Sequence, residues 1–191
     1  MRAAAFLDRD GVLSELIADP LSRTAESPLT VEEVRLIPGA AAAVARLTQA
    51  GFLPVCVSNQ PAAAKGTVSV AQLIAVHEQV TALLRREGVV LAASRLCLHH
   101  EQGVVPGLAG PCGCRKPAPG MLLDAAAELG VDLVSSWMVG DTDGDIAAGR
   151  AAGCRTLLIR HPASVHKRTQ GLKADVVADS LADGVTKLGL Q

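Results

Sequence analysis

The strongest constraint on the fold is an alternation of short, continuously apolar runs with longer helical patterns along the 191-residue chain. Five runs have the length and composition of strands buried on both faces, namely residues 3–8, 53–59, 94–100, 136–141 and 155–160. Helical patterns, each closed by a glycine, cover residues 39–51, 70–88, 120–130 and 145–153. This alternation predicts an α/β fold built on a doubly wound parallel sheet.

The chain has the length of one domain with a substantial core, so we expect residues 1–191 to form a single domain. Two insertions interrupt the alternation, one at about residues 14–37 and one at residues 97–116. Aromatic residues make up only 2% of the chain, so the core must be built from small and aliphatic side chains. The net charge of −1, without a long run of either sign, argues against binding to nucleic acids or membranes.

The amino-terminal sequence MRAAAFLDRDG reaches its first aspartate after too few apolar residues for a signal peptide. No later segment has the length of a membrane span. We therefore expect a cytoplasmic protein whose thiols stay reduced. Because no exposed apolar heptad is evident, we expect a monomer.

Polar side chains follow three of the predicted strands, at the edge where a doubly wound sheet binds its ligands. They are Asp8 and Asp10, Ser58 and Asn59, and Asp141, Asp143 and Asp145. If the first and fourth predicted strands are central and parallel, their carboxylates converge. Such a cluster needs a cation, and Mg2+ is the natural one. For Asp143 a helix cap or an Asx turn is an equally good interpretation.

The second insertion gathers three of the five cysteines in the stretch CLHHEQGVVPGLAGPCGCRKP. One residue separates Cys97 from His99, and one residue separates Cys112 from Cys114. Two short ligand pairs brought together across a loop predict a structural zinc site, with His100 as an alternative to His99. A disulfide is disfavoured in the cytoplasm. A metal-closed loop would also fix the arginine and lysine that follow it.

Four motifs occur in the order and spacing of a known enzyme superfamily. FLDRDGV resembles the D-x-D-G signature of the haloacid dehalogenase (HAD) superfamily of phosphotransferases, and VSN, Lys116 and GDTDGD resemble its second, third and fourth motifs. The resemblance covers residues 3 to about 160. It implies a HAD-like, Rossmannoid sheet and phosphoryl transfer assisted by Mg2+.

The resemblance also implies a role for each carboxylate. Asp8 would attack phosphorus to form an aspartyl-phosphate, and Asp10 would protonate the leaving alkoxide and then activate water. Mg2+ would be held by the Asp8 carboxylate, the Asp10 backbone carbonyl and Asp141. Asp145 would act from outside the metal's ligand set, as an acceptor for Lys116 or a metal-bound water.

Phosphate binding falls to the second and third motifs. By the same resemblance, Ser58 and the backbone of Asn59 would hold phosphate oxygens. Lys116 would offset the charge that builds up around phosphorus. An isolated lysine is usually solvated, but this one is restrained between the cysteine loop and a proline.

The zinc loop narrows the resemblance. C-x-H-H followed by C-x-C-R-K-P is similar to the loop of the D-glycero-D-manno-heptose-1,7-bisphosphate 7-phosphatases and of the related histidinol-phosphate phosphatases. These enzymes have a minimal cap and use loops to shape the pocket, so Arg115 would contact the substrate. The heptose branch implies removal of the C7 phosphate in the biosynthesis of nucleotide-activated heptose.

Histidinol phosphate remains the alternative substrate, because both substrates present a primary phosphate ester to the same motifs. A bisphosphate needs further cations, for which Arg115, Lys65 and Arg23 are candidates. Histidinol phosphate needs acidic or aromatic partners, and the scarcity of aromatics favours the sugar. A non-catalytic, zinc-organised interaction domain is an alternative of a different class. It would have lost Asp8 or Asp10, and both are present.

Two positions depart from the pattern of this branch. Ser14 stands where asparagine is usual, and the stretch SNQPAAAKG places Lys65 where arginine is usual. Both changes leave the catalytic core intact and bear on the choice of substrate.

Overall fold

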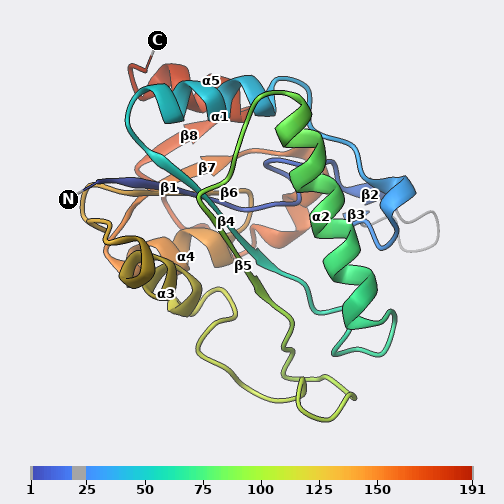
Figure 1. Ribbon diagram of the computed structural model, residues 1–191. Coiled ribbons are helices and arrows are strands. Elements are labelled where there is room, and N and C mark those ends of the chain that lie inside the picture. Colours follow the sequence, from blue (N-terminus) through green and yellow to red (C-terminus); the bar gives the residue numbers. More distant parts are fainter. Residues whose placement is uncertain (1, 19–24, 191) are drawn as a thin grey trace.

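The computed structural model describes residues 2–18 and 25–190 and is built around one sheet of six strands (Figure 1). Each neighbouring pair of strands is parallel. Their order across the sheet is β5 (Ala93–Cys97), β4 (Leu53–Asn59), β1 (Ala4–Leu7), β6 (Trp137–Gly140), β7 (Arg155–Ile159) and β8 (Val176–Ala178). The predicted doubly wound parallel sheet is confirmed.

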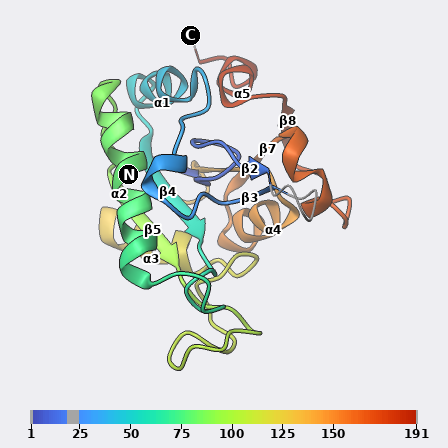
Figure 2. The same ribbon diagram turned by 90° about the vertical axis from the view of Figure 1, so that its right-hand side faces the viewer.

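Helices cover both faces of the sheet, which gives three layers (Figures 1 and 2). One face packs against α1 (Ala40–Gln49), α2 (Val70–Arg86) and α5 (Leu181–Lys187). The other packs against α3 (Gly120–Leu129) and α4 (Asp143–Ala152). No helix within the described ranges is long and apolar enough to cross a membrane.

Strand β1 lies where the chain changes direction across the sheet. From β1 the sheet grows one way through β4 and β5 and the other way through β6, β7 and β8. Leu7 pairs with Cys56 on one side and with Val139 on the other, and the Asp8 N–H donates to the Val139 carbonyl at 2.9 Å. The first, second and fourth motifs therefore leave three adjacent strands at the same edge, where such sheets bind ligands.

The edge strand β5 corrects two expectations. It ends at Cys97, so residues 98–100 are loop rather than strand, and most of its side chains are only half-buried. A strand at the edge of a sheet has a neighbour on one side only, so it cannot be covered like a central strand. Strand β8 extends the sheet beyond the five predicted strands, and helix α5 adds to the cover of one face.

The two insertions take different forms. The first contains a small antiparallel pair, β2 (Ile17–Ala18) with β3 (Ala25–Glu26), followed by the 3-10 turn η1 (Val31–Glu33). Arg23 lies outside the described residues. The second insertion is an extended loop that projects from the end of β5 (Figure 1). A second 3-10 segment, η2 (Pro162–Lys167), follows β7.

Candidate active site

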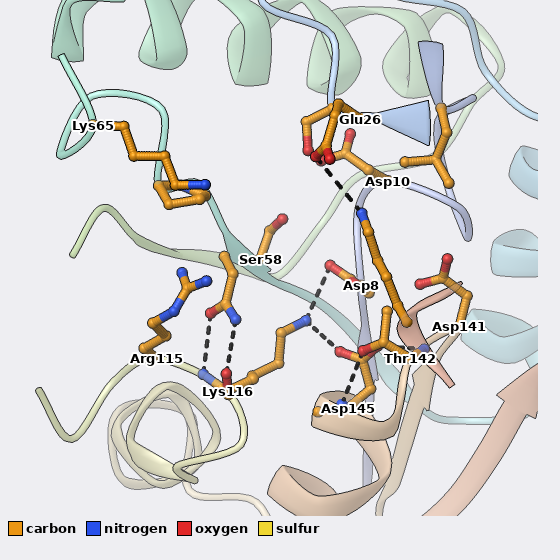
Figure 3. Close-up of a pocket in the computed structure, with 16 residues that line it drawn as sticks. Asp8, Asp10, Glu26, Ser58, Lys65, Arg115, Lys116, Asp141, Thr142 and Asp145 are labelled. Atoms are coloured by element: carbon orange, nitrogen blue, oxygen red, sulfur yellow. Dashed lines mark hydrogen bonds and ion pairs between the residues drawn. The ribbon is translucent and has the colours of Figure 1, made fainter. Parts of the chain in front are cut away.

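A cavity of about 390 Å³ opens at the carboxyl edge of the sheet (Figure 3). It gathers every residue predicted for catalysis, phosphate binding and Mg2+: Asp8, Asp10, Ser58, Asn59, Arg115, Lys116, Asp141 and Asp145. The first insertion contributes Leu16, Glu26 and Ser27 to the same cavity, and η2 contributes Lys167. Segments outside the four motifs therefore form part of the cavity wall.

Three buried carboxylates converge in this cavity. Asp8, Asp141 and Asp145 each offer an oxygen, and these oxygens lie within 4.8 Å of one another. Gly11 makes the approach possible, because its φ is +86° and a Cβ there would lie 2.2 Å from Asp141 Oδ2. Gly140 does the same for Asp145, whose Cβ would lie 2.2 Å from an added methyl group. Close packing thus requires glycine at positions 11 and 140.

Ionising these carboxylates in the fold costs free energy, so their pKa values are raised. Burial and then the Asp145 carboxylate raise the pKa of Asp8 to about 8, and the same two causes raise the pKa of Asp141 to about 7. Asp141 Oδ1 is buried and has no hydrogen-bond partner among the described residues. Oxygen ligands with excess negative charge and an unpaired acceptor are what Mg2+ requires, so the residues fit this ion.

These pKa values predict how stability depends on pH. Because Asp8 and Asp141 bind protons more tightly in the fold than in the unfolded chain, their contribution is full below about pH 4 and is lost toward about pH 8. Without Mg2+, the Tm should therefore fall between about pH 5 and about pH 8, and added Mg2+ should reduce the fall. Thermal unfolding of wild type and Asp141→Asn tests this. The variant should show a shallower fall, and a Tm that rises with pH in wild type would contradict the assignment.

Lys116 faces this cluster from the third motif. Its Nζ lies 3.0 Å from Asp8 Oδ1 and 2.6 Å from Asp145 Oδ1, and it donates to the Val57 carbonyl at 2.7 Å. Burial alone would lower the pKa of Lys116, but Asp145 and Asp8 raise it above its ordinary value. The lysine therefore stays charged and places a cation directly beside the nucleophile candidate (Figure 3).

Asn59 has a function that the sequence did not predict. Its Nδ2 donates to the Lys116 carbonyl at 2.9 Å, and its Oδ1 accepts from the Lys116 N–H at 3.0 Å. The side chain thus fixes the lysine's backbone, and Asn59 also lines the cavity. The buried Ser58 lines the cavity beside it.

The fourth motif also begins a helix. Thr142 is the N-cap of α4 and forms a capping box with Asp145, whose Oδ2 accepts from Thr142 N–H at 3.0 Å and from Thr142 Oγ1 at 2.6 Å. Neither interpretation of Asp143 holds. It is not the N-cap, it is absent from the carboxylate cluster, and its Oδ2 accepts from the Gln170 N–H at 2.6 Å.

Three further residues that sequence reasoning missed surround Asp10. Arg9 donates from Nε to Oδ1 at 2.9 Å and from Nη2 to Oδ2 at 3.0 Å. Ser14 Oγ donates to Oδ1 at 2.9 Å, and Gln60 Nε2 donates to Oδ2 at 2.7 Å. Burial alone would raise the pKa of Asp10, but Arg9, together with Ser27 and Gln60, lowers it. The position of Arg9 between two motif aspartates was the available signal.

Segment 161–168 holds the backbone of Asp141, a member of the carboxylate cluster. Ser164 Oγ donates to the Asp141 carbonyl at 3.3 Å, and Arg168 Nη1 donates to the same carbonyl at 3.0 Å. Lys167 lines the cavity and lies 3.9 Å from Glu26 across it. Nothing in the sequence motifs pointed to these contacts.

The predicted zinc ligands also converge. Cys114 Sγ lies 3.0 Å from Cys97 Sγ, 3.3 Å from Cys112 Sγ and 3.5 Å from His99 Nδ1. Ligand atoms around a tetrahedral zinc ion lie about 3.8 Å apart, so three thiols and one imidazole at this spacing fit zinc. His99 belongs to the cluster, whereas His100 Nδ1 accepts from the Gln102 N–H. The five cysteines are free, so the disulfide alternative is not supported.

This loop is tied to the cavity at several points. Asn59 pairs with Cys97 in the sheet, and the Gln60 N–H donates to the Cys97 carbonyl at 2.7 Å. Arg115 Nη1 donates to the His99 carbonyl at 3.3 Å. A predicted zinc ligand thus holds the arginine that is predicted to contact the substrate. The Val104 N–H donates to the Ala64 carbonyl at 2.8 Å, which links the loop to the second motif.

Comparison with known proteins gives consistent relatives. A protein of Rhodopseudomonas palustris is 36% identical over 80% of this chain and 80% of its own length, and one of Yersinia pestis is 35% identical over 94% and 92%. Both are named D-glycero-beta-D-manno-heptose-1,7-bisphosphate 7-phosphatase. The chain belongs to this phosphatase family. A family model described as HAD-hydrolase-like matches residues 113–184.

A solved structure of the 7-phosphatase family supports the same conclusion. The D,D-heptose 1,7-bisphosphate phosphatase of B. bronchiseptica, crystallised with magnesium and phosphate, covers 98% of each chain at 33% identity and a TM-score of 0.78. The resemblance to the HAD superfamily and the prediction of an enzyme are therefore confirmed, and a non-catalytic interaction domain is disfavoured. Magnesium chemistry agrees with the carboxylate cluster.

Proposed function

We propose that the protein hydrolyses the C7 phosphate of D-glycero-D-manno-heptose 1,7-bisphosphate with the help of Mg2+. The observation that carries this proposal is the cluster of Asp8, Asp141 and Asp145 facing Lys116 in one cavity of a 7-phosphatase family member. The product, heptose 1-phosphate, would enter the biosynthesis of nucleotide-activated heptose.

Asp8 is the proposed nucleophile and Asp10 the proposed acid and base. Asp8 attacks phosphorus as the bond to the leaving oxygen breaks, and Asp10 gives that oxygen a proton. Asp10 then takes a proton from the water that attacks phosphorus and releases Asp8. Lys116, 3.0 Å from the Asp8 carboxylate, faces the charge that accumulates on the phosphoryl oxygens.

Asp8, Asp141 and the backbone carbonyl of Asp10 would hold Mg2+, which neutralises charge on the transferring phosphoryl group. Asp145 stays outside this ligand set in the proposal, because its Oδ1 forms an ion pair with Lys116 and its Oδ2 accepts from Thr142. It thereby keeps the lysine charged and in place. Ser58 and the Asn59 N–H would bind phosphate oxygens.

Zinc is proposed for the cluster of Cys97, His99, Cys112 and Cys114. Burial and then hydrogen bonding with Cys97 raise the pKa of Cys114, so three thiols at this spacing need a cation to become ligands. The ion would occupy a closed structural site and hold the loop that positions Arg115 and Lys116.

The rim of the cavity favours a bisphosphate over histidinol phosphate. Lys65, Arg115 and Lys167 line it and could bind a second phosphate. No aromatic side chain stands among the described lining residues to stack on an imidazole ring, and the acidic Glu26 lies 3.9 Å from Lys167 Nζ, which counters its charge. The relatives' names point the same way.

The test compares kcat/KM for phosphate release from heptose 1,7-bisphosphate and from histidinol phosphate, with and without Mg2+. We expect a preference of at least about 100-fold for the bisphosphate, because the rim cations lose their partner with the monophosphate. Preference for histidinol phosphate, or activity that does not depend on Mg2+, would contradict the proposal.

We further propose that the protein acts as a monomer in the cytoplasm. Reduced thiols are needed to keep the zinc ligands available, and the cytoplasm maintains them. Light scattering of the zinc-loaded protein at assay concentrations should give the mass of one 19.6 kDa chain, and a dimer mass would contradict this expectation.

A further inference from the structure

Arg9 is the largest of the fully buried side chains, with 0% of its surface exposed. Its Nη1 has no hydrogen-bond partner among the described residues. A guanidinium group in such a place loses its hydration, and this costs free energy unless every donor is satisfied. The site therefore keeps Arg9 at a cost that a well-packed apolar side chain would avoid.

Stability does not explain the ion pair that Arg9 makes. Its partner is Asp10, the next residue, so the pair joins no two elements of the fold and closes no loop. Replacing a buried ion pair by apolar residues is often neutral or stabilising. The reason for Arg9 is better sought in what it does to Asp10.

The donors around Asp10 occupy the whole carboxylate. Oδ1 accepts from Arg9 Nε and Ser14 Oγ, while Oδ2 accepts from Arg9 Nη2 and Gln60 Nε2. A carboxylate has about four lone-pair positions, so a metal ion could bind Asp10 only by displacing one of these donors. Asp10 is accordingly absent from the cluster that its neighbour Asp8 forms with Asp141 and Asp145.

The proposed chemistry needs this separation. A carboxylate bound to a divalent cation gives its electron pair to the metal and cannot exchange a proton with the leaving oxygen or with water. Yet Asp10 stands two residues from Asp8, close enough to be drawn into the same ligand set. Something must therefore select which carboxylates bind the cation.

We propose that Arg9 is a positioning residue that keeps the Asp10 carboxylate off the catalytic cation. The bidentate fork fixes the plane of the carboxylate and takes one position on each oxygen. The neutral donors Ser14 and Gln60 take the remaining positions, and one of them yields its position when Asp10 exchanges a proton. This inference rests on the proposed function, because it assumes that Asp10 is the acid and base.

The test is a double-mutant cycle on cation affinity, measured without substrate. Mn2+, which substitutes for Mg2+ and is detected by paramagnetic resonance, is titrated into zinc-loaded wild type, Arg9→Met, Asp10→Asn and the double variant. Arg9→Met should bind Mn2+ about tenfold more tightly, because Asp10 joins the ligands. In the Asp10→Asn background the same change should leave the affinity unaltered. In parallel, kcat of Arg9→Met should fall while KM changes little.

Equal tightening in both backgrounds would mean that the loss of a positive charge alone is responsible, and would overturn the proposal. So would an unchanged or weaker affinity in Arg9→Met. Arg9→Lys keeps the positive charge but loses the bidentate fork, so it tests the proposal even if Arg9→Met does not fold. It should bind Mn2+ more tightly than wild type and turn over more slowly, and wild-type values for both would overturn the proposal. The proposed function fails instead on phosphate release by the wild-type enzyme.

Discussion

Asp8→Asn is expected to lose phosphatase activity by at least about 10⁴-fold while it folds normally and keeps its zinc. The amide is nearly isosteric with the carboxylate but cannot attack phosphorus. It also removes a buried acid whose pKa of about 8 shows that its charge is costly in the metal-free fold. The Tm of the variant without Mg2+ should therefore equal or exceed that of wild type at neutral pH. The measurements are kcat/KM, thermal unfolding and zinc content.

Asp143→Asn provides the matched control. Asp143 is buried and lies two residues from Asp141, but it is outside the carboxylate cluster and accepts from the Gln170 N–H. An amide oxygen can accept the same bond, so activity should stay within about tenfold of wild type. Substantial turnover by Asp8→Asn would remove Asp8 as the nucleophile, whatever the control shows.

The second large effect is expected at the zinc loop. Cys112→Ser should reduce zinc from about one ion per chain to a small fraction and should lower the Tm markedly. Structural zinc contributes on the order of 10 kcal/mol to the folding of small domains. The free energy of unfolding of this larger fold should fall by a part of that amount. kcat/KM should fall as well, because Arg115 and Lys116 follow the loop directly. Elemental analysis, thermal unfolding and kinetics measure the three effects.

Cys154→Ser is the control for loss of a thiol. Cys154 is 7% exposed, packs in the core beside α3 and α4, and is not among the four clustered ligands. It should keep full zinc and nearly full activity, with a modest loss of stability from burying a hydroxyl. If Cys112→Ser retained as much zinc as this control, Cys112 would not be a ligand.

The sequence predicted the fold well where one chain segment carries its own signal. Buried central strands such as β4 and β6 are largely apolar, and helices such as α3 are capped by a glycine, so their positions follow from local patterns. The end of β5 at Cys97 does not, because the apolar run continues while the neighbouring strand stops. The short elements β8 and α5 are fixed by packing against the sheet rather than by periodicity.

The candidate site divides in the same way. Asp8 and Asp141 follow from strand ends, and Cys97 follows from ligand spacing. The structure places the two aspartates in one cluster with Asp145, and Cys97 in a second cluster with His99, Cys112 and Cys114. The functions of Arg9 and Asn59 depend on where a side chain points after the chain has folded, and the motif letters do not contain that direction. The supports from segment 161–168 join parts of the chain that only the fold makes adjacent.

Phosphorus NMR of heptose 1,7-bisphosphate during turnover with Mg2+ tests directly whether the protein hydrolyses the C7 phosphate. The C7 and C1 phosphates give separate signals, so one spectrum reports which ester is cleaved. We expect the C7 signal to be replaced by inorganic phosphate while the C1 signal persists. Loss of the C1 signal first, or persistence of both signals at full Mg2+, would contradict the assignment of this cavity to a 7-phosphatase.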